Sequence, residues 1–353
     1  MTRFTKLCAA LAASTLIAGA ASAQVNLTGE TAGQGGVPGT VHAHLGEVAA
    51  ANGIANVQIQ FGQTLTNSVQ NLAEGKTDIV SSPQLLPFLL ANGRGPYSAL
   101  GKEAGAELAA NIRVLFTYSF GYTGLYAFDA NGVKGWEDLK GRRVYNGPPR
   151  GAALVMGQQI IQFMGGGKEG TDYTGIQVNW EQDIKTITDG SAEAIVLPMT
   201  FPDRRVTAAL ASGNMTLFSQ PKEIFESEAF QKYASTPGAA PLRIPVENMG
   251  YGSMADQVTI VSEDGLFRAV STTGSEIVHK DMDEELAYQL TKAVIDSLDA
   301  LKAKAPWGAN VGLGVLEVPD SGLCGLNPMK YHPGAVRAWE EAGYTVPECA
   351  KPS

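Results

Sequence analysis

The fold is decided by the stretch Lys134–Met164, which reads KGWEDLKGRRVYNGPPRGAALVMGQQIIQFM. It predicts a polar helical turn, a short strand at 143–145, a Gly/Pro loop at 147–151 and a helix over 152–164. A helix that begins directly after such a loop has unpaired backbone N–H groups and the positive end of its dipole in its first turn. The loop is therefore suited to hold an anion.

The same order of elements occurs earlier in the chain. Gly39 and Gly75 are 36 positions apart in the first unit, and Gly151 and Gly190 are 39 apart in the second. Two βαβαβ units of matched length predict two α/β lobes with a ligand cleft between facing sheet edges. The alternative stays open that the chain is one large doubly wound domain in which the order of elements is repeated by chance. The first unit is expected as a strand at 25–29, a Gly-rich loop at 33–40, a helix at 41–52, a strand at 57–61, a helix from 66 or 67 to 75 and a strand at 77–82. The second is expected as a strand at 143–146, a loop at 147–151, a helix at 152–164, a strand at 176–180, a helix ending at Gly190 and a strand at 193–197.

The remaining segments connect and close the two lobes. Strands at 113–118 and 124–128 are expected to carry the chain to the second lobe, and strands at 257–262 and 267–271 to return it. A long amphipathic helix at 284–303 and a capped helix after His332 then complete the first lobe. These segments place residues 24–127 with 256–353 in lobe 1 and residues 128–255 in lobe 2.

The first 23 residues have the pattern of an export signal. Arg3 and Lys6 precede an apolar run at 7–20, and Ala21-Ser22-Ala23 is a small-residue cleavage site before Gln24. We therefore expect a soluble protein exported to a bacterial periplasm. Loss of Arg3 and Lys6 changes the formal net charge from -9 to -11, which argues against nucleic acid and anionic lipid as partners.

Two cysteines, Cys324 and Cys349, follow the predicted signal. Export favours a disulfide between them, which the loop-entropy model values at roughly 3–4 kcal/mol. The alternative of a free reactive thiol stays open, although no His or Asn neighbourhood favours it.

Motifs for metal or cofactor chemistry are absent from the sequence. His42 and His44 are two positions apart on a predicted helix and point in nearly opposite directions, ~200° apart. The segment 165–168 has the Gly-Lys pair of a phosphate loop, but Glu169 replaces the Ser/Thr that would bind magnesium. We expect no cofactor, no metal and no enzymatic activity.

Several segments resemble the TAXI-type solute-binding proteins of TRAP transporters. They are NSVQNLAEGKTD at 67–78, GWEDLKGRRV at 135–144, PPRG at 148–151 and HPGA at 332–335. The resemblance covers almost the whole chain after residue 23. It implies an α/β, two-lobed fold like that of periplasmic binding proteins, each lobe a mostly parallel sheet flanked by helices. It also implies a receptor that passes small carboxylates, such as glutamate, glutamine or 2-oxoglutarate, to an ion-coupled permease.

The chain departs from this family at two loops. Gly39-Thr40-Val41-His42 replaces the usual Gly-Thr-Tyr-Tyr, and Pro149-Arg150-Gly151-Ala152 replaces Pro-Gly-Ser-Gly. Arg150 therefore supplies a guanidinium where relatives have a hydroxyl, and arginine binds carboxylates bidentately. The alternative is a solvent-facing loop cation.

Candidate ligand-binding residues lie at helix starts, at strand ends and where the chain crosses between lobes. Thr64 and Ser68 serve equally well as helix caps, and the two tyrosines as core residues. The candidates are Gly39, Thr40, Thr64, Ser68, Ser81, Ser82, Gln84, Tyr118, Tyr122, Arg150, Gly151, Ala152, Met199 and Phe201.

These observations together predict a monomeric periplasmic receptor for a small organic anion. The expected ligand is a dicarboxylate, an oxo acid or an acidic amino acid, and the expected partners are the membrane permease subunits of a TRAP transporter. An exported enzyme on the same scaffold, or a solute receptor for a sensory system, are the alternatives that the sequence leaves open.

Overall fold

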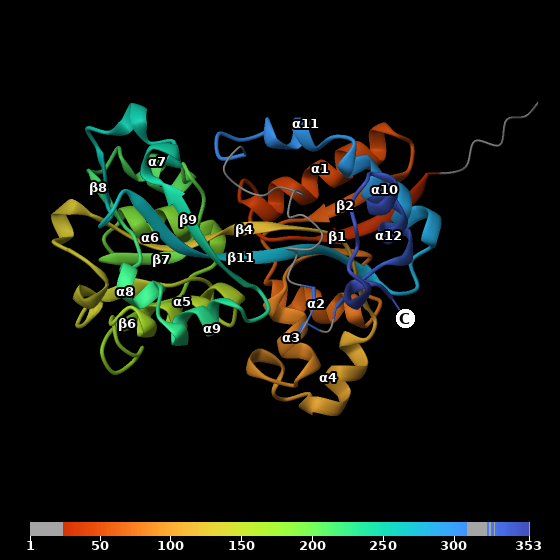
Figure 1. The fold of residues 1–353 in the computed structure, drawn as a ribbon, viewed down its shortest axis with the longest axis horizontal. Helices are drawn as coiled ribbons and strands as arrows, with labels where there is room; N and C mark the ends of the chain where they lie inside the picture. Colours follow the sequence, from red (N-terminus) through yellow and green to blue (C-terminus); the bar gives the residue numbers. More distant parts are fainter. Residues whose placement is uncertain (1–23, 309–322, 325, 328, 353) are drawn as a thin grey trace, which may run out of the picture.

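The computed structural model describes residues 24–308, 323–324, 326–327 and 329–352. The predicted export signal and its cleavage site lie outside these residues. The described elements form two groups joined by two long strands, β4 (Ile112–Phe128) and β11 (Leu266–His279) (Figure 1). We call residues 24–119 with the described residues from 273 on lobe 1, and residues 121–271 lobe 2.

One twisted sheet runs through both lobes. In lobe 1, β1 (Val25–Glu30) is parallel to both of its neighbours. In lobe 2, β5 (Arg143–Tyr145) is parallel to both of its neighbours. β11 pairs antiparallel with β4 along both lobes. The mixed α/β class predicted from the sequence is confirmed. The strand order is β2 (Ala55–Gln60), β1 (Val25–Glu30), β3 (Ile79–Pro83), β11, β4, β7 (Ala194–Met199), β5 (Arg143–Tyr145) and β6 (Thr174–Ile176).

The first predicted unit is present in lobe 1. Helix α1 (Val37–Ala51) begins four residues earlier than expected, because Gly36 is its N-cap and Pro38 is tolerated in the first turn. Helix α2 (Leu65–Ala73) begins after Thr64, and the chain turns at Gly75 with a φ of 72°. Both helices bury an apolar face in the lobe 1 core.

The second predicted unit is present in lobe 2. Helix α5 (Ala152–Phe163) starts after Gly151, as the sequence predicts. Strand β6 is shorter than expected, and the short 3₁₀ helix η4 (Trp180–Gln182) leads into α6 (Asp183–Thr188). The order strand, loop, helix, strand, helix, strand therefore occurs twice.

The crossing between lobes differs from the prediction. One continuous strand, β4, replaces the two strands expected at 113–118 and 124–128. Strand β10 (Val258–Val261), expected to have returned to lobe 1, instead pairs with β8 (Met215–Phe218), which pairs with the lobe 2 end of β4. The first part of β11 pairs with β9 (Ala239–Pro245). We infer that the chain returns to lobe 1 near Thr272, within β11, and not at residue 256.

The C-terminal part covers lobe 1. The helix expected over 284–303 is divided into two at Asp296 and Ser297, and His332 caps the last helix, as predicted. Cys324 and Cys349 form the predicted disulfide, with a Cα–Cα distance of 5.7 Å. The remaining elements are α3 (Leu85–Ala91), α4 (Gly101–Ala109), α7 (Arg204–Ala209), α8 (Lys222–Phe225), α9 (Glu228–Ala234), α10 (Glu284–Ile295), α11 (Leu298–Lys302), β12 (Lys330–Tyr331) and α12 (Pro333–Glu341).

Within residues 24–308 and the described residues from 323 on, no helix combines the length and the apolar character needed to cross a bilayer.

Candidate functional site

A cleft lies between the two lobes beside the crossing strands. It encloses about 1100 Å³ of space that is partly open to solvent. Its walls come from both lobes, and Phe120 and Thr272 of the crossing strands also line it. The lobe 1 wall includes Gly35, Gly36, Val37, Thr64, Leu65 and Thr66, and the lobe 2 wall includes Gly151, Ala152, Ala153, Asp183, Asp203, Arg204 and Arg205.

Several helices begin at the walls of this cleft, and three of them have an N-cap residue in its lining that makes no side-chain cap hydrogen bond. These three are α1, α2 and α5, and their N-cap residues are Gly36, Thr64 and Gly151. None of these three caps makes a side-chain hydrogen bond to its own helix. The first-turn N–H groups are therefore not satisfied by capping side chains, and the helix dipoles add partial positive charge. The cleft is biased toward negatively charged groups.

The two lobes touch each other at the mouth of the cleft. The hydroxyl of Thr66 in α2 donates a hydrogen bond of 2.9 Å to the backbone carbonyl of Arg150 in lobe 2. The Glu181 carboxylate lies so close to Gly62 that a Cβ at this glycine would overlap with it. These contacts join the two lobes directly.

One ion pair in the lobe 2 wall is saturated. The Arg205 Nε and Nη2 atoms donate to the two carboxylate oxygens of Asp203 at 3.0 and 2.9 Å, and both side chains are nearly buried. Asp203 also caps α7 and accepts from the Thr200 amide. Burial would raise the pKa of Asp203, but the charge of Arg205 and these hydrogen bonds outweigh it and the pKa lies below its ordinary value. The pair fixes the end of β7 to the start of α7.

A second ion pair in the same wall leaves hydrogen-bond donors of its arginine unused. Arg204 Nη2 lies 2.6 Å from Asp183 Oδ2, and the other carboxylate oxygen accepts from the Ile184 amide at 2.6 Å. The Asp183 side chain is 3% exposed, whereas that of Arg204 is 40% exposed. Arginine has five N–H donors, and Asp183 is the one partner of this guanidinium among the described residues. The Arg204 Cδ atom lies 3.9 Å from the position of a Cβ on Gly35, so the side chain reaches the lobe 1 wall.

Three of the predicted ligand-binding residues line the cleft, namely Thr64, Gly151 and Ala152. Gly39 and Thr40 do not, because α1 begins at Val37 and places both residues inside the helix. A Cβ on Gly39 would sit 2.5 Å from the Gly33 carbonyl oxygen. This glycine therefore allows the loop to pack on the helix.

The predicted polar residues of lobe 1 lie in its interior. Ser81 and Tyr118 donate to the Glu276 carboxylate at 2.6 and 2.7 Å, and His42 Nδ1 lies 2.8 Å from its other oxygen. All four side chains are buried. Burial and the charge of Glu276 raise the pKa of Tyr118 well above its ordinary value. The hydroxyl groups of Ser81 and Tyr118, which were expected to contact the ligand, instead donate to the buried carboxylate of Glu276.

The neighbouring candidates are also buried, and none lines the cleft. Ser68 lies in the core side of α2. Ser82 donates to the Pro83 carbonyl, and Gln84 bonds with Ser275 and Asn327. β3 is an inner strand of the sheet, so the residues at its end face covering elements.

The aromatic candidates of lobe 2 form core. Tyr122 stacks on Phe201 with ring centroids 5.4 Å apart, and the sulfur of Met199 packs where Gly124 has no Cβ. Arg150 is exposed and does not line the cleft. Its backbone has a φ of 66°, and it is the carbonyl of Arg150, not the guanidinium, that meets lobe 1. The arginines that line the cleft are Arg204 and Arg205.

Most residues that line the cleft are not among the predicted binding residues, and they include Phe120, Trp180, Asp183, Arg204 and Trp307. One signal was available. Asp203-Arg204-Arg205 follows a predicted buried strand at the same place in the unit where we placed ligand contacts in lobe 1.

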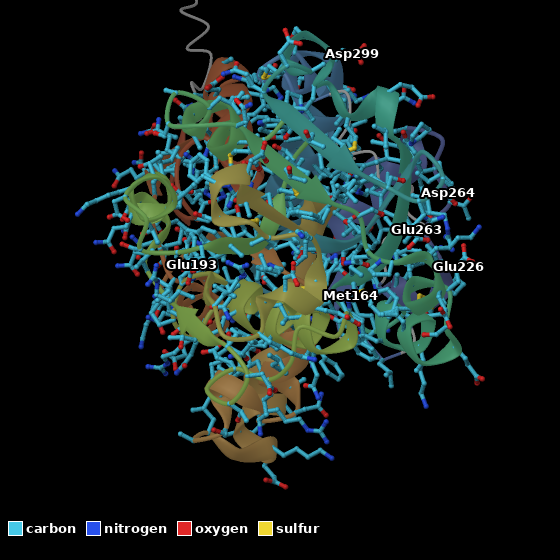
Figure 2. All side chains as sticks on the ribbon, turned by 90° about the vertical axis from the view of Figure 1, so that its left-hand side faces the viewer. Met164, Glu193, Glu226, Glu263, Asp264 and Asp299 are labelled. Atoms are coloured by element: carbon cyan, nitrogen blue, oxygen red, sulfur yellow. A yellow bond between two sulfur atoms is a disulfide. The ribbon has the colours of Figure 1, made fainter. Side chains whose placement is uncertain are left out.

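A third arginine-carboxylate cluster lies at the lobe 2 surface. Figure 2 labels Glu226, Glu263 and Asp264, whose charges all act on the buried Arg268. Arg268 Nη1 donates to Asp264 Oδ1 at 3.0 Å, and this bonding lowers the pKa of Asp264 to about 2. None of these four residues lines the cleft. Among the residues that the structure describes, no group of three or more His, Cys, Asp and Glu is arranged to hold a metal ion.

A protein-family model matches most of the chain. The family described as NMT1-like matches residues 30–343. No curated protein matches the chain.

Solved structures give distant similarities. A TRAP periplasmic solute-binding protein from Desulfovibrio salexigens with bound orotic acid is 9% identical, with 90% of this chain and 89% of that chain covered and a TM-score of 0.47. One from Chromohalobacter salexigens with bound (S)-(+)-2-amino-1-propanol is 12% identical, with 90% of each chain covered and a TM-score of 0.46. The periplasmic aliphatic sulphonate-binding protein of Escherichia coli is 10% identical, with 84% and 78% covered and a TM-score of 0.41. TM-scores below 0.5 are too low to assign a ligand to this chain.

Proposed function

The chain belongs to the NMT1-like family, and we propose that it is an exported solute receptor. It closes two lobes around a small carboxylate and delivers it to the membrane permease of a TRAP transporter. The observation that carries the proposal is the cleft, whose walls come from both lobes around two crossing strands. A ligand held there contacts both lobes at once.

Closure supplies the mechanism. A solute that binds both walls stabilises the closed state more than the open one, and so shifts the population between them. The Thr66–Arg150 hydrogen bond adds a direct contact between the lobes in the closed state. The permease then distinguishes the closed surface from the open one.

The carboxylate class is supported by the charges at the cleft. Three uncapped helix starts and the partly free guanidinium of Arg204 face the space. The TAXI subtype and the TRAP permease are proposed from the segments at 67–78, 135–144, 148–151 and 332–335. Export is proposed from the signal pattern in residues 1–23.

A receptor is favoured over an enzyme by the state of the acidic residues. Asp183 and Asp203 line the cleft, and each accepts from an arginine. For Asp203, burial acts to raise the pKa, but the charge and hydrogen bonds of Arg205 outweigh it and lower the pKa, so this carboxylate is a weak proton acceptor. The saturated Asp203 is therefore suited to structure and not to acid–base chemistry.

The proposal is tested by thermal unfolding of residues 24–353 against a panel of small solutes. The panel contains mono- and dicarboxylates, oxo acids, amino acids, sulfonates and sugars. A ligand at 100 times its Kd stabilises by ~2.7 kcal/mol, which shifts Tm by several degrees.

Three variants identify the residue that holds the ligand. Arg204→Gln should remove the shift, whereas Arg150→Gln and the exposed control Arg94→Gln should keep it. A shift that survives in Arg204→Gln and disappears in Arg150→Gln would contradict the site. A complete panel without any shift, repeated on protein refolded to remove carried ligand, would contradict the receptor function.

A further inference from the structure

The charges that line the cleft cancel. Arg204 and Arg205 are its cations, and Asp183 and Asp203 are its anions, among the described residues. Arg205 is already bonded to both oxygens of Asp203 and to the Pro198 carbonyl. The Arg204 side chain is the more exposed of the two, at 40% against 8% for that of Arg205, and its guanidinium offers a ligand the donors that Asp183 does not use.

Most of the remaining wall is apolar. Leu65, Leu86 and Val37 contribute from lobe 1, and Pro148 and Pro198 from lobe 2. Three aromatic rings, those of Phe120, Trp180 and Trp307, add flat apolar surface from the crossing strand, from lobe 2 and from lobe 1. Such a wall favours an apolar ligand body over a heavily hydrated one.

We infer that the ligand is an amphipathic monoanion, with one acidic group at Arg204 and an apolar body between the aromatic side chains. This inference rests on the proposed receptor function and narrows its ligand class. Arg204 determines the charge of the ligand. Asp183 is a positioning residue, because it holds Arg204 Nη2 and leaves the other N–H donors to the cleft.

A dicarboxylate does not fit this arrangement. Its second charge would need a second cation, and the charge of the only other arginine in the described lining is already paired with that of Asp203. Residues 309–322, which follow Trp307, contain no lysine or arginine in the sequence. The Asp183 carboxylate, 2.6 Å from the guanidinium, also repels a second negative charge. A buried unpaired carboxylate is strongly disfavoured.

Two matched series of probes test the inference by isothermal titration calorimetry. The first is hexanoate, hexanamide and adipate, and the second is 3-phenylpropionate, 3-phenylpropionamide and 3-(4-carboxyphenyl)propionate. Within each series the body is retained, and the charge is -1, 0 or -2. We expect the monoanion to bind at least tenfold more tightly than the dianion and than the amide.

Variants then locate the preference. Arg204→Gln should bring the Kd of the monoanion to within threefold of that of the amide, since the group that distinguishes them is gone. The exposed Arg94→Gln should retain the preference of the unmodified protein. Asp183→Asn should reduce the penalty on the dianion relative to the monoanion, which a merely structural role would not do.

Each other outcome overturns the inference. Dianions that bind as tightly as monoanions, a charge preference that survives Arg204→Gln, or failure of all six probes would each do so. The receptor proposal is judged separately by the wider solute panel. A different ligand that shifts Tm there would leave the receptor standing and remove only the monoanion assignment.

Discussion

Each lobe has a cluster of buried charged and polar groups near the cleft, and the two clusters differ in what they leave free. In lobe 1, Glu276 is surrounded by His42, Ser81 and Tyr118, all of which are buried. In lobe 2, Asp203 is saturated by Arg205, but Asp183 holds a guanidinium that is 40% exposed. The lobe 1 cluster is therefore structural, and the lobe 2 cluster combines structure with a ligand-facing charge.

This difference shows how a polar side chain near a strand end becomes available to a ligand. Ser81 lies within β3, and Arg204 begins the helix that follows β7. A buried carboxylate takes the serine hydroxyl, whereas the guanidinium of Arg204 has more donors than its partner uses. A side chain can bind a ligand when it has more hydrogen-bond donors than its partners within the protein use, and its position near a strand is not sufficient.

The largest effect is expected for Glu276→Ala in lobe 1. The change leaves the His42 ring and two hydroxyl groups buried without their partner, which should lower the free energy of unfolding by ~3–5 kcal/mol. Urea unfolding measures it. The control is Glu47→Ala, because Glu47 is 62% exposed in its pair with Lys304 and should cost below ~1 kcal/mol. Equal costs for the two variants would show that the lobe 1 cluster is not structural.

Arg204→Gln in lobe 2 should reduce ligand affinity more than it reduces the stability of the fold. We expect at least a tenfold loss of affinity for the anion that the solute panel identifies, or ~1.4 kcal/mol of binding free energy. The Arg204 side chain is 40% exposed and glutamine can still donate to the buried Asp183 carboxylate, so the free energy of unfolding should fall by less than it does for Glu276→Ala. Calorimetric titration and urea unfolding on the same sample separate the two quantities. A large loss of stability with unchanged affinity would reverse the comparison.

A smaller effect is expected at the contact between the lobes. Thr66→Val removes the hydroxyl that donates to the Arg150 carbonyl while it retains the side-chain shape. The loss of one hydrogen bond should weaken the closed state by ~0.5–1.5 kcal/mol, and ligand affinity should fall by at most about tenfold. Ligand dissociation rates, measured by stopped flow, should rise accordingly. Unchanged rates would remove this bond from the closing mechanism.

Mild acid should give the smallest effect and should act on lobe 1 first. Burial lowers the pKa of His44 and of His332 in lobe 1. Their neutral forms stabilise the fold above the unfolded pKa of ~6.5, and this contribution is lost as the pH falls toward the folded pKa. The pKa of Asp203 in lobe 2 is also lowered, so its contribution persists until the pH falls below the unfolded pKa of ~3.9.

Hydrogen exchange at pH 7 and pH 5.5, corrected for intrinsic rates, measures this difference. Peptides from α1 should lose protection, and peptides from α7 should retain it. Equal loss in both lobes would contradict the assignment of pH sensitivity to lobe 1.

Much of the fold follows from local patterns in the sequence. The strand, loop and helix at 143–163 occur where the glycines and prolines predict them, and the earlier unit repeats that order. Cys324 and Cys349 pair as expected. These features depend on neighbours in the chain or on a single covalent bond.

The site was predicted less well because it depends on the directions in which side chains point and on hydrogen-bond partners that are distant in the sequence. The sequence places Ser81 and Tyr118 near strand ends, but their partner Glu276 is 195 and 158 positions away. Arg150 attracted attention because it replaces a hydroxyl residue. Its left-handed backbone conformation brings the carbonyl to lobe 1 instead, and a local pattern does not reveal that conformation in a residue other than glycine.

The central claim is that the lobes close on a ligand held between them, and an inter-lobe distance tests it most directly. Spin labels on cysteines replacing the exposed Gln60 and Lys185 flank the place where Glu181 meets Gly62. Double electron–electron resonance should show a broad distribution without ligand and a shorter, narrower one with the solute that raises Tm. The same solute should produce no change in Arg204→Gln. A distance distribution that a stabilising solute leaves unchanged would contradict closure around the cleft.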